Sequence, residues 1–361
     1  MENISSAIFF GKVREHLYKQ FPFVIYRKKD SDRTIGLFQN NAVSNVVSDF
    51  SETGYLFAPF NGNKTFIIPE NDSAIFSSEI SINESSKNKV EFPINETSKS
   101  GHLTLVQKGI DAIQNQQFSK VVLSRKEIVE FDEFDLENTF KTLLELYPTA
   151  FSYCWFHPET GLWLGAFSEQ LLKVRQNELH TMSVAGTQKW HDGDIIWQEK
   201  EKEEQQIVTD FIVENLSSFS DGISISEPYT LKAGNIGHIK TDIKANLTSD
   251  TKLSDIIAIL HPTPAVCGMP KDKARQFIIE NENYEREFYS GFHGELNKDF
   301  LTGVKQTDLF VNLRCMKIEN NQASLYIGGG ITKDSIPENE WVETVNKAQT
   351  MKKVLAQNIK L

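Results

Sequence analysis

The chain has 361 residues, of which 39% are hydrophobic and 24% are charged, and its formal net charge is -11. This composition is typical of a globular protein with enough apolar residues to form a large core. The acidic balance disfavours non-specific binding of nucleic acid, which depends on basic surface. We therefore expect no nucleic-acid partner, and an anionic ligand would need local positive charge.

The cysteines and the N-terminal residues lead to expectations about the compartment. Cys154, Cys267 and Cys315 are widely spaced and include no Cys-x-x-Cys pair, which argues against a disulfide framework and against a zinc site. Residues 1–20 contain no basic segment ahead of an apolar stretch, and no run of about 18 apolar residues occurs anywhere. These features predict a cytoplasmic protein without a membrane partner.

The first 100 residues contain strand-like runs and one long polar segment. FPFVIYR and KTFIIP have the composition of strands and are separated by turn-forming residues. Residues 80–100 are rich in Ser, Asn and Lys and lack apolar periodicity, which predicts a loop or linker that divides the chain. Ser98 or Ser100 is a candidate cap of a following helix. Its apolar residues recur at helical spacing and are Leu103, Val106, Ile110 and Ile113.

Residues 118–128, FSKVVLSRKEI, alternate in the manner of a strand. Lys120 falls on the same face as Val122 and Ser124, two small residues typical of a protein interior. Two interpretations fit an ammonium there. Either the stem of Lys120 packs while its head reaches solvent, as is common for a lone lysine on a strand, or the amine has a chemical function in a water-poor site.

Most of the remaining chain has strand-like or helical patterns. Further strands are expected at residues 149–157, 161–167, 171–176, 222–226, 308–319 and 322–330. Helices are expected at residues 135–146, 195–217, 252–260, 271–282 and 337–357. Runs of strands with few strand-helix-strand units predict an α+β protein built on antiparallel sheets.

The helix expected at 195–217 carries a carboxylate in an unusual place. A helical wheel puts Glu204 close to the centre of the arc formed by the apolar side chains. A carboxylate aimed at an apolar face must be paired, neutralised or bound to a cation. Alternatively, Glu204 lies at the start of the helix, where that face is still open to water.

The last helix also carries a group of charged residues. Ser335 and Glu338 predict a capping box at its start. Its expected buried stripe is Trp341, Val345, Ala348 and Leu355. Glu340, Glu343 and Lys347 share a different face, and the last two alone are typical of a solvated surface pair.

Three glycines, Gly328–Gly330, precede this helix. They allow backbone to approach a ligand closely, although a plain turn explains them as well. Together the two helices offer Glu204 and Glu343 to one hard cation. Carboxylate oxygens with retained water are the ligands that Mg²⁺ prefers.

Eight segments of the chain resemble, in order, the motifs of the chorismate-utilising enzymes. They are SKVVLSR, WLGAFSEQLL, SVAGT, HPTPAVCGMP, YEREFYSGFHGEL, FVNLRCMK, YIGGGIT and EWVETVNK. The resemblance covers residues 98–361 and implies one α+β fold, with two antiparallel β-sheets packed together and helices outside. On this basis residues 96–361 form the chorismate-binding catalytic core, and residues 1–95 form a more variable N-terminal part of the same fold.

Within the family, the resemblance favours the isochorismate synthase branch. Isochorismate and salicylate synthases have Lys at the position of Lys120, where anthranilate synthases have a non-basic residue. Aminodeoxychorismate synthases have a nucleophilic Lys at a second position, which is Ala185 in this chain. The resemblance implies a Mg²⁺-dependent isomerisation of chorismate to isochorismate. In that reaction Lys120 is the general base for the water that adds at C2, and Glu169 protonates the departing C4 hydroxyl. An apolar, water-poor strand face favours the neutral amine that a general base needs.

The same resemblance implies roles for further residues. Glu204 and Glu343 match the Mg²⁺ ligands, and Glu340 would act through water. Arg314 matches the residue that grips the enolpyruvyl carboxylate, a bidentate contact that Lys would make less well. The other expected substrate contacts are Thr187, His261, Tyr289, Ile327, Gly329 and Lys347.

Three positions depart from the family pattern. Phe167 and Ser168 stand where the family usually has Ser and Pro ahead of the glutamate, so the shape of that loop is expected to differ. Gln205 replaces the His that usually follows the first metal ligand, which alters the groups around it.

Three other functions fit parts of this pattern. A salicylate synthase makes isochorismate and then eliminates pyruvate, a step that depends on pocket geometry. An anthranilate-type subunit works with a glutaminase, but Lys120 argues against it, so no glutaminase partner is expected. A non-catalytic chorismate-binding protein is disfavoured by the joint presence of Lys120, Glu169, Glu204, Glu343 and Arg314. The pathway, whether to menaquinone, a siderophore or salicylate, is left open.

Overall fold

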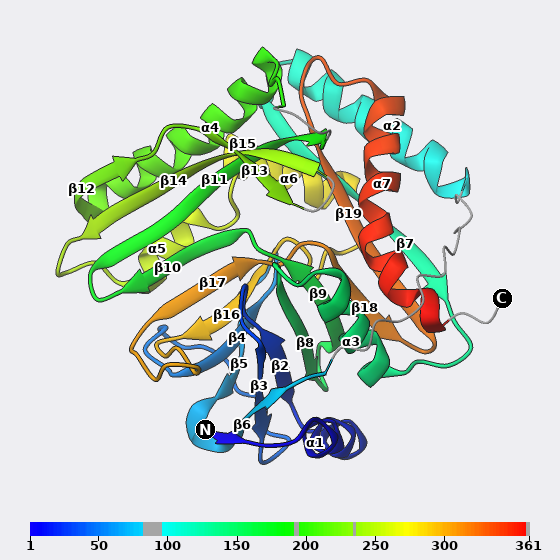
Figure 1. The fold of residues 1–361 in the computed structure, drawn as a ribbon. Helices are drawn as coiled ribbons and strands as arrows, with labels where there is room; N and C mark the ends of the chain where they lie inside the picture. Colours follow the sequence, from blue (N-terminus) through cyan, green and yellow to red (C-terminus); the bar gives the residue numbers. More distant parts are fainter. Residues whose placement is uncertain (82–95, 191–194, 234–235, 359–361) are drawn as a thin grey trace.

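A computed structural model describes residues 1–81, 96–190, 195–233 and 236–358, which form two large β-sheets flanked by helices (Figure 1). Adjacent strands are antiparallel in both sheets, except that β1 pairs parallel to β6. The predicted α+β class with two packed antiparallel sheets is confirmed.

The first sheet has ten strands among the described residues, in the order β1-β6-β3-β2-β8-β9-β18-β19-β7-β15. Their bounds are β1 Glu2–Asn3, β2 Phe23–Arg27, β3 Arg33–Gln39, β6 Ser73–Glu79, β7 Lys120–Glu130, β8 Phe151–His157, β9 Gly161–Phe167, β15 Gly268–Met269, β18 Cys315–Glu319 and β19 Gln322–Ile331.

The second sheet has nine strands in the described part of the chain, in the order β12-β14-β11-β10-β17-β16-β4-β5, with β13 also paired to β14. Their bounds are β4 Gly54–Ala58, β5 Phe66–Pro69, β10 Gln170–Arg175, β11 Glu178–Lys189, β12 Ser220–Ile225, β13 Tyr229–Ala233, β14 Ile236–Leu247, β16 Phe292–Leu296 and β17 Thr307–Val311.

Helices pack on both sheets. Their bounds are α1 Ser6–Lys19, α2 Glu96–Gln114, α3 Leu136–Leu146, α4 Glu199–Leu216, α5 Leu253–Leu260, α6 Lys271–Asn281 and α7 Pro337–Leu355. Helix α7 lies beside α2 and contacts β19, whereas α4 runs along β11 and β14 (Figure 1). This arrangement brings α4 and α7 to the region between the two sheets.

N-terminal strands belong to both sheets. β2 pairs with β8 in the first sheet, and β4 pairs with β16 in the second. Aromatic side chains join the sheets there: Phe57 of β4 and Trp155 of β8 have ring centroids 5.1 Å apart, and Trp155 is fully buried. The proposed division between residues 95 and 96 stays a prediction, because residues 82–95 are outside the described ranges.

The predicted caps at the starts of helices α2 and α7 were wrong. α2 begins at Glu96, so Ser98 and Ser100 lie inside the helix and not at its N-cap position, and the polar segment becomes helical before residue 100. α7 begins after Ile336 with Pro337 in its first turn and no side-chain cap. The Ser335 hydroxyl instead accepts a hydrogen bond from the Thr332 amide at 3.1 Å, because the chain turns back on itself there.

The strand expected at 308–319 is two strands, β17 and β18, which belong to different sheets. The break comes at Arg314, whose φ of 47° is in the left-handed region that few non-glycine residues adopt. The chain crosses from one sheet to the other at this point. Arg314 is therefore placed between the sheets.

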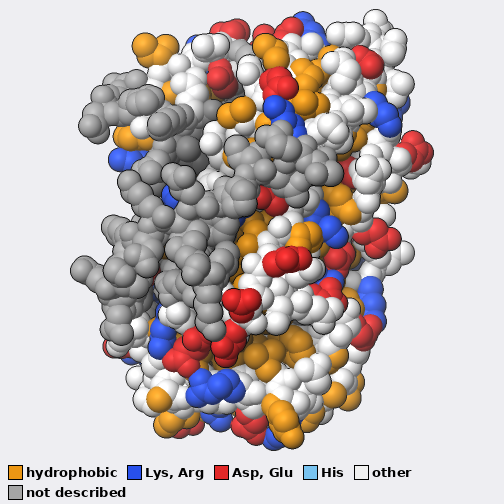
Figure 2. Space-filling model, turned by 90° about the vertical axis from the view of Figure 1, so that its right-hand side faces the viewer, with side chains coloured by type: hydrophobic (Ala, Val, Ile, Leu, Met, Phe, Trp, Pro, Cys, Tyr) orange, Lys and Arg blue, Asp and Glu red, His pale blue; other side chains and the backbone are white. Residues whose placement is uncertain are grey.

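The cysteines and the apolar content of the helices can be described directly. The three cysteines are buried free thiols. No described helix is long and apolar enough to cross a membrane. On the face shown in Figure 2, the visible Lys and Arg side chains are scattered among Asp and Glu rather than gathered.

Candidate active site

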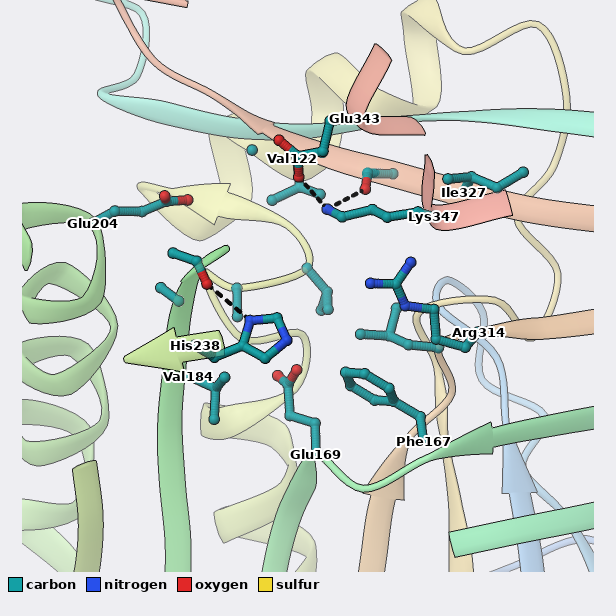
Figure 3. A pocket seen from close by; sticks show the side chains of 18 of the residues that line it. Val122, Phe167, Glu169, Val184, Glu204, His238, Arg314, Ile327, Glu343 and Lys347 are labelled. Atoms are coloured by element: carbon teal, nitrogen blue, oxygen red, sulfur yellow. Dashed lines mark hydrogen bonds and ion pairs between the residues drawn. The ribbon is translucent and has the colours of Figure 1, made fainter. Parts of the chain in front are cut away.

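Residues of both sheets and of helices α4 and α7 line a cavity of about 200 Å³ (Figure 3). The first sheet contributes residues of β7 and β19, and the second contributes residues of β11 and β14. The predicted site residues that line the cavity are Lys120, Glu169, Glu204, Tyr289, Arg314, Ile327, Gly329, Glu340, Glu343 and Lys347. The fold thus gathers side chains from segments that are far apart in the sequence.

Lys120 is the first residue of β7 and is 1% exposed. Its Nζ lies 2.7 Å from Oε1 of Glu204 on α4. The head of this side chain does not reach solvent, so the interpretation of Lys120 as a packed stem with a solvated head is wrong. Burial of a cation is costly unless the cation is paired, and Glu204 supplies that pair. Glu204 in turn is 19% exposed and points at a cation rather than at open solvent.

The glycine triplet makes room for this pair. Gly330 on β19 lies opposite Val122 in the ladder with β7. A Cβ atom at Gly330 would lie 2.6 Å from Glu204 Oε1 and 3.3 Å from Lys120 Cε. A side chain at this position would therefore displace the ion pair.

The carboxylates of α7 approach the neighbouring glycine. A Cβ atom at Gly329 would lie 3.6 Å from Glu340 Oε2 and 4.0 Å from Glu343 Oε1, which is ordinary contact. Glu343 pairs with Lys347, whose Nζ also donates to the carbonyl of Gly328 at 3.0 Å (Figure 3). Glu343 and Lys347 therefore form an ion pair, as predicted, but the pair faces the cavity.

The expected metal ligands line the same cavity but are not gathered at one point in the described structure. Glu204, Glu340 and Glu343 all border the backbone of two consecutive glycines, Gly329 and Gly330. Among the described residues, no three His, Cys, Asp or Glu side chains converge as a metal site. Two of the carboxylates hold lysine ammonium groups instead.

Glu169 lies between β9 and β10, and its carboxyl points into the cavity (Figure 3). Enclosure by the protein raises the pKa of this carboxyl to about 7, although the positive charges of Lys120, Arg314 and Lys347 oppose the rise. A large fraction of Glu169 is then protonated near neutral pH, which is the form a general acid requires.

Arg314 directs its guanidinium into the cavity beside Phe167 (Figure 3). Its Cζ lies 5.9 Å from the centroid of the Phe167 ring. Burial lowers the pKa of Arg314 from its usual value. In the described part of the chain it has no carboxylate within ion-pair distance. A guanidinium held in this way is suited to binding the carboxylate of a ligand.

One expected substrate contact, His261, does not line the cavity. His261 ends α5, and its ring packs edge-on against Phe292 at 4.8 Å rather than facing the other site residues. Burial lowers the pKa of His261 to about 3. The backbone of Thr187 is part of β11, but its side chain is outside the described part of the structure.

His238 and Glu201 are among the cavity residues that sequence reasoning missed. The Nδ1 of His238 lies 2.8 Å from the carbonyl of Gly186 (Figure 3). Because a carbonyl only accepts, Nδ1 carries the proton, and burial lowers the pKa of His238 to about 4, so the neutral ring offers Nε2 as an acceptor. The available signal for Glu201 was its position three residues before Glu204, on the same helix face.

A model of the chorismate binding enzyme family matches residues 64–356. The chain belongs to this family. The matched range contains all the described residues of the cavity.

Individual members of the family resemble the chain over most of its length. The isochorismate synthase MenF of Escherichia coli (strain K12) is 29% identical over 269 residues, which is 71% of this chain and 60% of that protein. The isochorismate synthase EntC of the same strain is 28% identical over 246 residues, or 65% of this chain and 62% of that protein. The chain therefore spans less than two thirds of the length of these relatives.

The fold is also that of a solved family member. The structure of MenF, the menaquinone-specific isochorismate synthase from Escherichia coli, superposes with a TM-score of 0.77. The superposition covers 93% of this chain and 89% of that chain at 21% identity.

Proposed function

We propose that the protein is an isochorismate synthase, which converts chorismate to isochorismate. The observation that supports this most strongly is the buried amine of Lys120, which shares one cavity with a carboxyl, Glu169, whose pKa is raised to about 7. An exchange of hydroxyl position on a ring needs one group that takes a proton from water and another that gives a proton to the departing hydroxyl. The names of the similar relatives support the same reaction.

The proposed reaction begins with water adding at C2 of the ring, and Lys120 takes its proton. The ring double bond shifts, and the C4 hydroxyl leaves as water with the proton of Glu169. One water enters and one leaves, so the reaction is an isomerisation. Because Lys120 is an ammonium paired with Glu204 at 2.7 Å in the structure, this ion pair has to open and the ammonium has to release one proton before the amine accepts a proton from water.

Substrate binding is proposed to use the positive groups of the cavity. Arg314 would bind the enolpyruvyl carboxylate through two N–H groups. Lys347 lies on the other side of the cavity, near Glu343, and would lie near the ring carboxylate. The backbone of Ile327 and Gly329, with Tyr289, would complete the lining.

The donor set fits the Mg²⁺ that we propose as cofactor. Glu204 and Glu343 would be its ligands and Glu340 would act through water, because carboxylates are its preferred protein ligands and all three line the same cavity. When bound, the ion would neutralise the ring carboxylate and fix its orientation. Since both ligand carboxylates now hold ammonium groups, the ion would replace those pairs.

Removal of the metal should abolish turnover. We expect isothermal titration to detect one Mg²⁺ per chain, and excess chelator to reduce isochorismate formation to background. Glu343→Gln should weaken Mg²⁺ binding at least about tenfold, because loss of a ligand or its supporting group typically has that effect. Glu214→Gln, on α4 outside the cavity, is the matched control and should bind Mg²⁺ normally. Full activity in chelator would contradict the metal assignment.

A single added methyl group at Gly330 should also impair the site. Gly330→Ala places a carbon 2.6 Å from Glu204 Oε1, and displacement of a catalytic group by about 1 Å can lower the rate roughly 100-fold. Gly222→Ala is the control, because Gly222 on β12 does not line the cavity and a Cβ atom there would meet nothing within 4 Å. We expect kcat/KM for chorismate to fall much further in Gly330→Ala. Equal kcat/KM in the two variants would show that the space at Gly330 is not needed.

The proposed reaction is tested by its products. Purified protein is incubated with chorismate and Mg²⁺, and the products are identified by chromatography with mass detection. We expect isochorismate as the only product. Added ammonia should not change this product, since we propose that the protein acts without a glutaminase subunit. We also propose that it acts in the cytoplasm. Salicylate with pyruvate would assign a salicylate synthase instead, and unchanged chorismate would favour a non-catalytic binding protein.

A further inference from the structure

The aromatic residue next to the unpaired guanidinium has no role in the reaction described so far. Phe167 is the last residue of β9, and its ring enters the cavity between Glu169 and Arg314 (Figure 3). The motif that the chain resembles usually has a serine here. A large aromatic ring therefore occupies a position at which a small polar side chain is the usual choice.

The backbone holds Phe167 and Arg314 side by side. β9 pairs with β18, and the amide of Ala166 donates to the carbonyl of Arg314 at 3.2 Å. Ser168 holds the backbone on the other side of Phe167, because its hydroxyl accepts a hydrogen bond from the amide of Phe151 on β8 at 3.1 Å. A proline in place of Ser168 would have no such hydroxyl. The two departures from the family pattern thus act together to fix the ring.

The guanidinium has few other restraints among the described residues. An arginine side chain has many rotamers, and fixing them when a ligand binds weakens the binding. The Cζ of Arg314 lies 5.9 Å from the centre of the Phe167 ring, within the range of a cation–π contact. Such a contact is stronger in a cavity with little water than on an exposed surface.

We propose that Phe167 is a positioning residue that holds the Arg314 guanidinium against the face of its ring. The contact fixes the direction in which the N–H groups of Arg314 meet the carboxylate of the ligand. This inference rests on the proposed function, because it takes that carboxylate to be the enolpyruvyl carboxylate of chorismate. The ring acts on binding and not on proton transfer.

The test compares Phe167→Leu with Phe167→Tyr. Leucine keeps apolar bulk but removes the aromatic face, whereas tyrosine keeps that face. Chorismate binding is measured by calorimetry with Mg²⁺ in a Lys120→Ala background, in which turnover is blocked. We expect Phe167→Leu to weaken binding about five- to thirtyfold, and Phe167→Tyr to change it less than about twofold. With Lys120 intact, KM should rise by the same factor while kcat changes little.

A double-mutant cycle separates positioning from simple space filling. In an Arg314→Gln background, Phe167→Leu should have no further effect, because the cation is gone. Equal binding by the Phe167→Leu protein and its parent, or an undiminished effect in the Arg314→Gln background, would overturn the inference and leave the proposed function intact. No chorismate binding by the Lys120→Ala protein, together with no turnover by the native chain, would overturn both.

Discussion

Lys120→Ala is expected to lower kcat for isochorismate formation by about 10²–10⁴-fold, the usual contribution of a general base. Lys120 is buried and is paired with Glu204 at 2.7 Å, so no solvent-exposed amine can take its place from outside. Chorismate affinity should change only a few-fold, because Arg314 and Lys347 still face the cavity. Steady-state turnover and calorimetric binding separate the two effects.

Lys126→Ala is the matched control for this variant. Lys126 lies on the same strand but is exposed, so its removal should leave both kcat and the unfolding temperature nearly unchanged. A Lys120→Ala protein that folds and retains turnover within about tenfold of the native chain would contradict the base assignment, since general-base losses are larger. A Lys120→Ala protein that loses chorismate affinity but keeps its kcat would show that Lys120 binds the substrate and is not the general base.

Glu169→Gln is expected to lower kcat by a similar factor of about 10²–10⁴. The amide has nearly the shape of the acid but no proton to give to the C4 hydroxyl. Glu178→Gln is the control, because Glu178 is the exposed first residue of β11, and kcat should be unchanged in this variant. A Glu169→Gln enzyme with native kcat would show that the leaving hydroxyl receives its proton from another group.

The pKa of Glu169 predicts a pH dependence that disappears with the residue. The folded protein holds this carboxyl with a pKa of about 7, against 4.5 for an ordinary glutamate. The acid is active when protonated, so kcat should fall as pH rises through about 7. The same ionisation affects stability: its contribution is fully present below pH 4.5 and is lost as pH rises through about 7. The unfolding temperature of the native chain should therefore fall over this interval more than that of Glu169→Gln.

Periodicity was enough to predict most elements of the fold. The helices expected at 135–146, 252–260 and 271–282 match α3, α5 and α6 within one residue at each end. Their apolar faces pack on the sheets, and this packing is what the pattern reports. Helix α1 and several strands were missed, among them β3, β11 and β14. In β14, the buried residues Ile239, Thr241, Ile243 and Ala245 alternate with Lys240, Asp242 and Lys244, which is a strand pattern that the prediction overlooked.

Local signals were weaker guides than packing. Ser98, Ser100 and Ser335 all have the chemistry of helix caps, yet none lies at the N-cap position of its helix. A cap contributes only about 1 kcal/mol, so the burial of α2 and α7 against each other and against the sheets decides where these helices start. The positive φ of Arg314 likewise has no signal in its own residue type.

Some cavity residues could also be predicted from local sequence patterns, and others depended on the packing of the whole fold. The helical wheel found Glu204 because its position contradicts the apolar pattern around it. Burial of Lys120 followed from its strand face, but its partner could not be predicted, because the meeting of β7 and α4 depends on the whole fold. The positions of His261 and His238 relative to the cavity could not be predicted from the sequence. A histidine carries no information on which way it faces until its strand or helix is placed, and β14 was not predicted.

The measurement that tests the central claim most directly is the conversion of chorismate in water enriched in ¹⁸O. If Lys120 activates a water molecule for addition at C2 while Glu169 protonates the departing C4 hydroxyl, the isochorismate formed must carry one oxygen from solvent. We predict that its mass rises by that one label, and that the label appears with the same time course as the product. Unlabelled isochorismate would mean that the hydroxyl moves within the molecule, and the roles assigned to Lys120 and Glu169 would then be wrong.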